Sequence, residues 1–102
     1  MKIIDPGHEY ALANMDNGEQ VLSFIKKEHV VTENTGSFKT VKDGTTNEEV
    51  LRVMIDRMNF LQAKTPCREN AIVITKLEEC LMWLEKRTAD RIERGVEGTT
   101  NK

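Results

Sequence analysis

Four side chains in the second half of this sequence are of the types that hold a nucleotide-like ligand. Phe60 stands off the main apolar stripe of its segment, and an aromatic face can stack a nucleobase for about 1–3 kcal/mol. Asn70 carries an amide that can hydrogen-bond a base edge or a ribose hydroxyl. Arg57 and Arg87 carry guanidinium groups, which can stack on a base or clasp a phosphate through two parallel hydrogen bonds.

Each of these residues also has a purely structural interpretation. Phe60 can be a core or interface aromatic, and Asn70, near the start of a predicted helix, can be its N-cap. Arg57 and Arg87 can be solvated helix charges. The spacing of the residues does not by itself choose between binding and structure.

The sequence lacks the constellations that catalysis requires. His8 and His29 stand outside any nucleophile motif, and the turn-like segment from Pro6 to Tyr10 favours a backbone contact for His8 over a role as a base. Ser23 and Ser37 lack the Gly-x-Ser-x-Gly elbow. Neither a Walker loop nor a glycine-rich dinucleotide fingerprint occurs. We therefore predict that the protein is not an enzyme.

The cysteines and acidic turns do not form a metal site either. Cys67 and Cys80 are thirteen positions apart, with no Cys-x-x-Cys pair and no histidines at ligand spacing. Asp43-Gly44 is typical of a turn, since the alternating oxygen ligands of a calcium loop are missing. The sequence predicts no metal and no cofactor, and it favours two buried or half-buried thiols.

Length and composition limit the class of protein. The chain has 102 residues and a mass of 11.7 kDa, which predicts a single domain over residues 1–102. A formal net charge of −2 excludes a broad basic field for gripping duplex nucleic acid. No apolar run approaches the ~18 residues of a membrane span, and Asp5 follows Met1 too closely for a signal peptide. A cytoplasmic location is the expectation.

The first half of the chain carries strand signals, over about residues 8–42. Tyr10 and Leu12 alternate with smaller residues, and Leu22 and Phe24 alternate with their neighbours in a second run. Asn17-Gly18, between the two runs, predicts a hairpin turn because both residues tolerate positive φ. Lys26 and Lys27 are expected to close the second run. Val30–Thr32 and Phe38–Val41 are weaker strand candidates, and the polar and glycine residues between and after them predict a mobile connection near residues 33–44.

The second half is predicted to be helical, over about residues 46–64 and 68–94. Thr46 and Glu49 form a capping box, and Pro66 ends the first helix because it disfavours helical geometry at the residue before it. Gly95 ends the second helix. Apolar residues recur at helical spacing in both segments: Val50, Leu51, Met54, Ile55, Met58 and Leu61, then Ile74, Leu77, Leu81 and Leu84.

These elements predict an α+β fold, in which a small N-terminal antiparallel β-sheet precedes a long antiparallel two-helix hairpin. The second helix would be nearly 40 Å long at roughly 1.5 Å per residue, more than a globule of this size needs. So small a sheet and hairpin cannot hide every apolar stripe, which predicts a homo-oligomer. Residues 96–102 are expected to form a disordered tail.

Three elements occur in order along the chain: GHEYAL with VLSFIKKE (residues 7–12 and 21–28), GTTNEEVLRVMIDRMNFLQ (44–62), and Pro66 with Asn70 and Leu77 to Arg87. This ordered set resembles the phage anti-Thoeris sponge family over about residues 5–95. The helix hairpin is also similar to that of the phage anti-CBASS sponge, whose ligands are cyclic oligonucleotides.

The resemblance implies a catalytically inert protein that sequesters an immune signal intact, so that the host effector is never activated. The signal of Thoeris is glycocyclic ADP-ribose, a cyclised nucleotide with an adenine, two riboses and a pyrophosphate. By position, Phe60, Asn70 and Arg87 match the family residues around the ADP-ribose ring. The resemblance also implies a homo-oligomer, a dimer or a hexamer, in the cytoplasm of the infected bacterial host.

Two other classes of binding protein stay open. A sponge mainly for cyclic di- or trinucleotides would use Gly44, Thr45, Thr46 and Arg57, because the start of a helix offers backbone N–H groups to phosphates. A helical adaptor without a small ligand would use the amphipathic helices and their methionines, which usually mark a core or an interface. A hydrolase that degrades the signal would need a base or metal site, which the sequence lacks.

Overall fold

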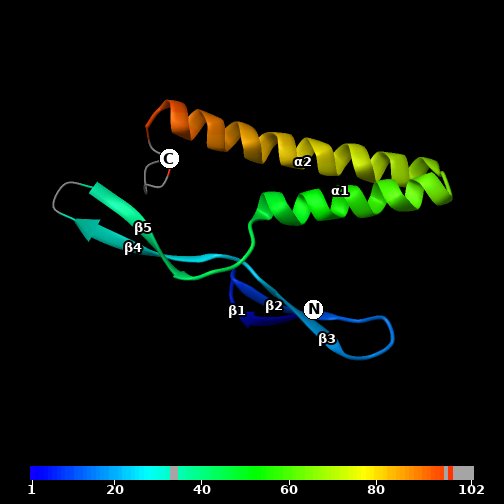
Figure 1. Cartoon of the computed structure of the whole chain (residues 1–102), viewed down its shortest axis with the longest axis horizontal. Coiled ribbons are helices and arrows are strands. Elements are labelled where there is room, and N and C mark those ends of the chain that lie inside the picture. The colour runs from blue at the N-terminus through cyan, green and yellow to red at the C-terminus, as the bar shows by residue number, and fades with distance from the viewer. Residues whose placement is uncertain (33–34, 96, 98–102) are drawn as a thin grey trace. The chain divides into compact units, whose positions relative to one another are not determined.

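The computed structural model of this chain describes residues 1–32, 35–95 and 97. The backbone contacts divide it into two compact units. We call residues Met1–Thr46 the sheet unit and residues Asn47–Glu97 the helix unit, and describe each by itself (Figure 1). The α+β fold is as predicted, with antiparallel strands followed by two long helices.

The first sheet has three antiparallel strands in the order β1 (Lys2–Asp5), β2 (Glu9–Ala13) and β3 (Glu19–Ser23). The predicted turn joins β2 to β3, and Asn17 and Gly18 have φ angles of 84° and 85° there. Two consecutive residues with positive φ match the right-handed twist of the strands they connect. Strand β1 was missing from the prediction, since four residues at an edge are too few to display an alternating pattern.

The second sheet is the hairpin of β4 (Lys26–Thr32) and β5 (Thr35–Lys42), and it corrects two predictions. The expected mobile connection over residues 33–44 is mostly strand, because the backbone of β5 pairs with β4 along its length, and only residues 33–34 of it lie outside the described part. Lys26 and Lys27 open a strand and do not close one. Cross-strand hydrogen bonds thus outweigh the turn-forming preferences of the small polar residues in this segment.

The two sheets are joined inside the sheet unit by backbone bonds and by charge pairs. Phe24 and Thr45 form a parallel bridge between the segments that follow β3 and β5. The Lys26 ammonium lies 2.9 Å from a carboxylate oxygen of Asp5, and Lys42 donates a hydrogen bond to Glu9. These hydrogen bonds are the main cause that lowers the pKa of each carboxyl group below its ordinary value. Two small sheets without a deep core are therefore tied together by polar contacts.

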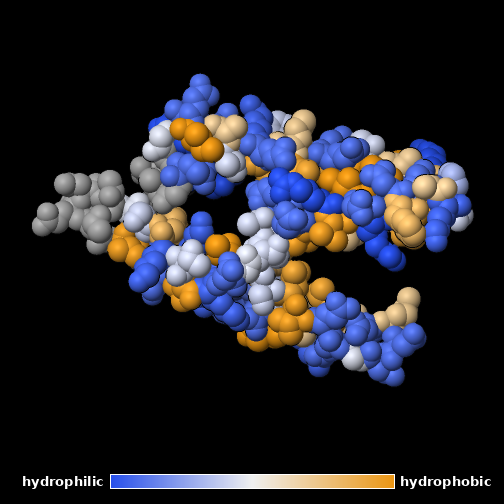
Figure 2. All heavy atoms as spheres, viewed as in Figure 1, coloured by the Kyte–Doolittle hydropathy of each residue, from blue (hydrophilic) through white to orange (hydrophobic). Residues whose placement is uncertain are grey.

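The helix unit is an antiparallel hairpin of α1 (Asn47–Lys64) and α2 (Arg68–Glu93). The side chains that meet between the helices recur three and four residues apart, which is the narrow seam of a coiled coil. They are half-buried: Leu51, Ile55, Met58 and Gln62 on α1, and Ile74, Leu77, Leu81, Leu84 and Thr88 on α2. Figure 2 shows hydrophobic side chains gathered along this line. Most residues of the stripes predicted from the sequence thus lie on the half-buried side of the helices, but Met54, predicted as one of them, is 41% exposed.

The ends of the helices follow the local sequence. Helix α1 begins one residue after Thr46, and α2 ends before Gly95, whose φ of +72° stops the helix. The N-cap of α2 is Cys67, whose Sγ accepts a hydrogen bond from the Asn70 N–H at 3.4 Å, so the interpretation of Asn70 as the N-cap was wrong. Except for Glu97, the tail predicted to be disordered lies outside the described residues.

Very little of the described chain is fully buried. Ala11 in the sheet unit and Arg91 in the helix unit are the two described residues with less than a tenth of their surface exposed. Both cysteines are exposed, which corrects the expectation of buried or half-buried thiols. Large apolar side chains also face solvent on the helices, among them Val53, Trp83 and Ile92 at 60% exposure or more. No helix among the described residues combines the length and apolarity that a membrane span requires.

Candidate functional site

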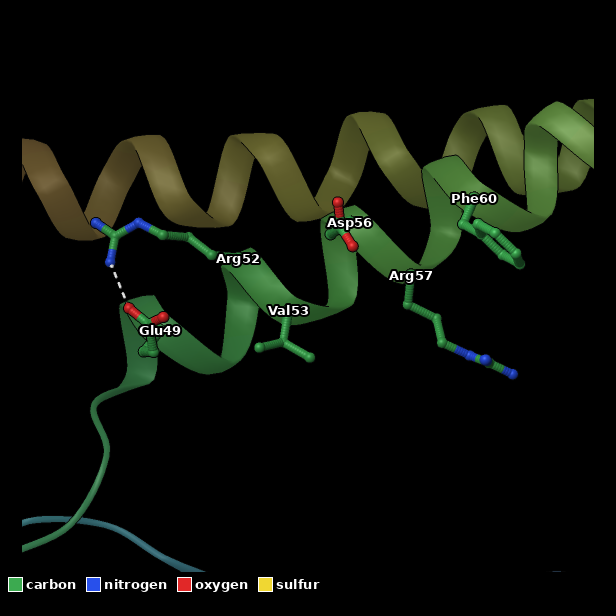
Figure 3. Close-up of a pocket in the computed structure, with 6 residues that line it drawn as sticks. All are labelled: Glu49, Arg52, Val53, Asp56, Arg57 and Phe60. Atoms are coloured by element: carbon green, nitrogen blue, oxygen red, sulfur yellow. Dashed lines mark hydrogen bonds and ion pairs between the residues drawn. The ribbon is translucent and has the colours of Figure 1, made fainter.

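The outward face of α1 carries an open hollow of about 520 Å³. Its lining consists of Glu49, Arg52, Val53, Asp56, Arg57 and Phe60 (Figure 3). Val53, Arg57 and Phe60 extend from the side of α1 that faces away from α2. The helix thus presents its seam to α2 on one side and a mixed aromatic and charged surface to solvent on the other.

Phe60 is the aromatic side chain of this hollow. It is 56% exposed and stands outside the seam, so within one copy of the chain it is not a core residue. The ammonium of Lys64, one helical turn further on, lies 4.6 Å from the centre of the ring. This is the geometry of a cation–π contact on one face of an exposed ring.

The two arginines of the hollow are in different electrostatic states. Arg52 donates hydrogen bonds to Glu49 and to Glu85 of α2, each at 3.2 Å, so two carboxylates offset its charge. Arg57 makes no hydrogen bond or ion pair with any residue that the structure describes. An anionic group is therefore attracted toward the Arg57 and Phe60 end of the hollow and not toward the Glu49 end.

Asn70 and Arg87 both lie on α2, at widely separated positions. The Asn70 side chain is half-buried near the start of the helix, and Arg87 is exposed near its other end. Neither side chain is paired within the described part of the chain. They are seventeen positions apart on the helix, which is about 25 Å at 1.5 Å per residue. One copy of the helix therefore does not bring both residues to a single small ligand.

Gly44 and Thr45 lie in the sheet unit, where their backbones are already engaged. The Thr45 N–H donates to the Ser23 carbonyl oxygen, and the Thr45 carbonyl oxygen accepts from the Ile25 N–H, both at 2.9 Å. The Gly44 N–H donates to a carboxylate oxygen of Asp43. The oligonucleotide alternative expected backbone N–H groups here to be available for a phosphate. In the structure, the N–H groups of Gly44 and Thr45 both have hydrogen-bond acceptors within the protein. Thr46 stands at the N-cap position of α1.

Gly44 has a steric reason to be glycine. A Cβ atom placed on it would lie 2.5 Å from the carbonyl carbon of Phe24, closer than real Cβ contacts come. The backbone of the segment before α1 therefore approaches the end of β3 more closely than any side chain allows. This close approach sets the path of the chain into the first helix.

The described residues contain no group of three or more His, Cys, Asp or Glu side chains placed to hold a metal ion. His8 lies in the turn between β1 and β2, where its Nδ1 is 3.0 Å from the carbonyl oxygen of Pro6. This is the backbone contact that the sequence favoured. Lys64 was absent from the predicted set, although its place four residues after Phe60 on a helix was a usable signal.

The fold defines a small α+β protein built around a two-helix hairpin, with its exposed aromatic and unpaired arginine on one helix face. The family described as "Acb2/Tad1, hairpin domain" matches residues 26–89, more than half of the chain. The protein therefore belongs to the Acb2/Tad1 hairpin-domain family, which confirms the resemblance drawn from the ordered motifs. The matched range covers β4, β5, α1 and most of α2, and it includes all seven predicted binding residues.

A relative with a curated name supports the same assignment. The chain is 54% identical over 61 residues to a protein named "Thoeris anti-defense 1" from Bacillus phage SBSphiJ7. The similar stretch is 59% of this chain and 43% of the relative, so it spans less than half of the relative's length. The likeness thus concerns one part of a longer protein.

Proposed function

We propose that this protein is a phage anti-defence sponge, which binds glycocyclic ADP-ribose and holds it without breaking any bond. The observation that carries the proposal is the 54% identity to a relative named for its action against Thoeris. Sequestration lowers the concentration of the signal, so the host effector stays inactive. This work requires tight binding, and it requires no nucleophile or metal.

The hollow on α1 offers the chemistry for such a ligand. The exposed ring of Phe60 stacks the adenine, and the unpaired guanidinium of Arg57 attracts the pyrophosphate. Asn70 supplies an amide for a base edge or a ribose hydroxyl, and Arg87 supplies a second guanidinium. All four groups are available for a ligand, because none of the four side chains is engaged by a hydrogen bond or ion pair to a described residue.

A second copy of the chain completes this site. Asn70 and Arg87 of one copy are about 25 Å apart along α2, whereas a cyclised nucleotide is much shorter. We therefore place Arg87 of one copy near Phe60 and Asn70 of another, in a dimer or hexamer. The half-buried seam and the exposed Val53, Trp83 and Ile92 supply apolar surface for such an assembly.

Titration calorimetry against a glycocyclic ADP-ribose isomer tests the proposal, with the ligand then released by heat and identified by chromatography. We expect nanomolar binding and recovery of unchanged ligand. The variant Phe60→Ala should bind about 10- to 100-fold more weakly, because stacking contributes roughly 1–3 kcal/mol per base. The matched control is Phe38→Ala, which removes another exposed aromatic, 44% exposed on β5, and should stay within about twofold of the wild type.

Several outcomes contradict parts of this proposal. Undiminished affinity of Phe60→Ala removes the ring from the site, and so does an equal loss in Phe38→Ala. A chemically altered ligand after release indicates catalysis and excludes a sponge. Silence with glycocyclic ADP-ribose but binding of a cyclic trinucleotide favours the sponge for cyclic oligonucleotides, and silence with both ligands favours the helical adaptor.

A further inference from the structure

A second stripe runs along α1 beside the seam. Val53, Arg57, Phe60 and Lys64 recur at intervals of four, three and four residues, so they share one face of the helix. The members of the seam, by contrast, face α2. In the second stripe the exposed aromatic ring is flanked by a cation on each side along the helix. We call these three residues, Arg57, Phe60 and Lys64, the aromatic–cation stripe.

Lys64 has a single described contact in this stripe. Its ammonium lies 4.6 Å from the centre of the Phe60 ring, and no described carboxylate pairs with it. Lys64 is also the last residue of α1, where the negative end of the helix dipole favours a cation. The ammonium is therefore held close to the ring while it keeps its charge available for a further anion.

Charge is unevenly distributed along this face of α1, from carboxylates near its start to unpaired cations near Phe60. At the start of α1, the carboxylates of Glu49 and Glu85 offset the charge of Arg52. Asp56 adds a negative group midway along the face. The two unpaired cations, Arg57 and Lys64, both stand at the Phe60 end. A ligand with a flat base and two linked phosphates therefore matches this end in both shape and charge.

We infer that Lys64 is a further ligand-binding residue of this site, and that it acts in two ways. Its ammonium covers one face of Phe60 and so restricts the ring before the base stacks on the other face, which lowers the entropy lost on binding. It also supplies, with Arg57, the second cation for a diphosphate. The inference rests on the proposed function, because the base and the diphosphate belong to glycocyclic ADP-ribose.

The test compares the affinity of the full-length wild type, Lys64→Met and Lys64→Arg for glycocyclic ADP-ribose by calorimetry at low and high salt. Met keeps the length of the side chain and removes its charge, whereas Arg keeps both the charge and the cation–π contact. We expect Lys64→Met to bind about tenfold more weakly and to depend less on salt. Lys64→Arg should stay within about threefold of the wild type.

The control is Lys76→Met, which lowers the net charge by the same amount. Lys76 is an exposed lysine on α2 whose ammonium lies 3.7 Å from a carboxylate oxygen of Glu79. We expect its affinity to stay within about twofold of the wild type. Equal losses in Lys64→Met and Lys76→Met overturn the inference, because they indicate a general effect of charge. An unchanged affinity or an unchanged salt dependence in Lys64→Met also overturns it.

The same experiment separates this inference from the proposed function. If the wild type binds and Phe60→Ala loses affinity while Lys64→Met does not, the sponge stands and the role of Lys64 is rejected. If the wild type does not bind glycocyclic ADP-ribose, the proposed function fails and the role of Lys64 fails with it. Circular dichroism of each variant checks that the helices are intact.

Discussion

The contacts that stabilise the sheet unit internally differ from those that stabilise the helix unit. In the sheet unit, backbone ladders and the charge pairs of Lys26 with Asp5 and Lys42 with Glu9 join two small sheets, and Ala11 is its one buried residue among those described. In the helix unit, a seam of apolar side chains at alternating spacings of three and four residues joins two helices. Backbone pairing therefore organises the sheet unit, whereas side chains along the seam and the Arg52–Glu85 ion pair join the two helices.

The difference bears on where a ligand site can be built. Helix positions fix the direction of a side chain through the regular turn of the backbone, so the spacing of Arg57, Phe60 and Lys64 alone puts them on one face. In the sheet unit, by contrast, the backbone N–H groups of Gly44 and Thr45 are engaged within the unit itself. The exposed ring of Phe60 and the unpaired Arg57 lie together on α1.

The largest change in stability is expected when a side chain of the seam between the helices is truncated. Leu77→Ala should lower the free energy of unfolding of the helix unit by about 2 kcal/mol, at the low end for such substitutions because the side chain is half-buried. Urea unfolding followed by the fluorescence of Trp83, the sole tryptophan, measures this at a fixed protein concentration. The control Ile72→Ala removes an exposed apolar side chain outside the seam and should cost clearly less. Equal losses in the two variants would contradict the seam.

The next largest effect is expected where the backbone of Gly44 lies against the backbone of Phe24 in the sheet unit. Gly44→Ala places a methyl group against the backbone of Phe24 and should destabilise the sheet unit by about 1–3 kcal/mol, because backbone atoms must move apart. Hydrogen exchange of peptides from β2 to β5 reports the loss. Thr45→Ala keeps the backbone bonds and should change stability by less than about 0.5 kcal/mol. Unchanged exchange in Gly44→Ala would show that the two segments separate at no cost.

The smallest expected effect is the loss of stability of the sheet unit at low pH, which arises from charge pairs inside that unit. The pKa values of Asp5 and Glu9 are lowered in the folded protein, mainly by hydrogen bonds from Lys26 and Lys42. Their contribution to stability is therefore complete above the ordinary values of 3.8 and 4.5, and it is lost as the pH falls below them toward the folded values. Acid should thus speed hydrogen exchange in the sheet unit, and less so in high salt.

Lys42→Met is the matched variant for this pH effect. It removes the ion-pair partner of Glu9, while the hydrogen bond from Ser23 to Glu9 and the pair of Lys26 with Asp5 stay in place. We expect a shallower dependence of exchange on pH below 4.5 in this variant, with the intrinsic exchange rate corrected at each pH. The same dependence in Lys42→Met and the wild type would show that the charge pair contributes nothing to the sheet unit.

The helices were the most predictable part of the fold. Their apolar periodicity, the capping residues near Thr46 and the stop at Gly95 are local signals, and the helices observed end within a residue or two of the expected ends. The turn at Asn17 and Gly18 was predictable for the same reason, because these residue types tolerate positive φ. Strand β1 was not predicted, and only residues 38–41 of β5 were strand candidates, since both strands depend on pairing with a neighbouring strand.

For the predicted binding residues as well, features set by helical spacing were predictable and features set by the three-dimensional path of the chain were not. The sequence placed Phe60 and Arg57 on one helix, and their shared hollow follows from that spacing. It did not reveal that Cys67 replaces Asn70 as the N-cap, because cap preferences are small and the path of the interhelical link decides which residue is used. The contact of Lys64 with Phe60 likewise depends on a side-chain conformation.

By itself, the sequence determined the α+β order, the two helices and the family, because periodicity, caps and ordered motifs are properties of neighbouring residues. The tertiary structure alone decided that the strand candidate at residues 38–41 extends over residues 35–42, that Gly44 and Thr45 have their N–H groups engaged, and that Arg52 is paired while Arg57 is not. These features depend on which groups distant in the sequence meet in space, and the pattern of neighbouring residues does not specify those partners.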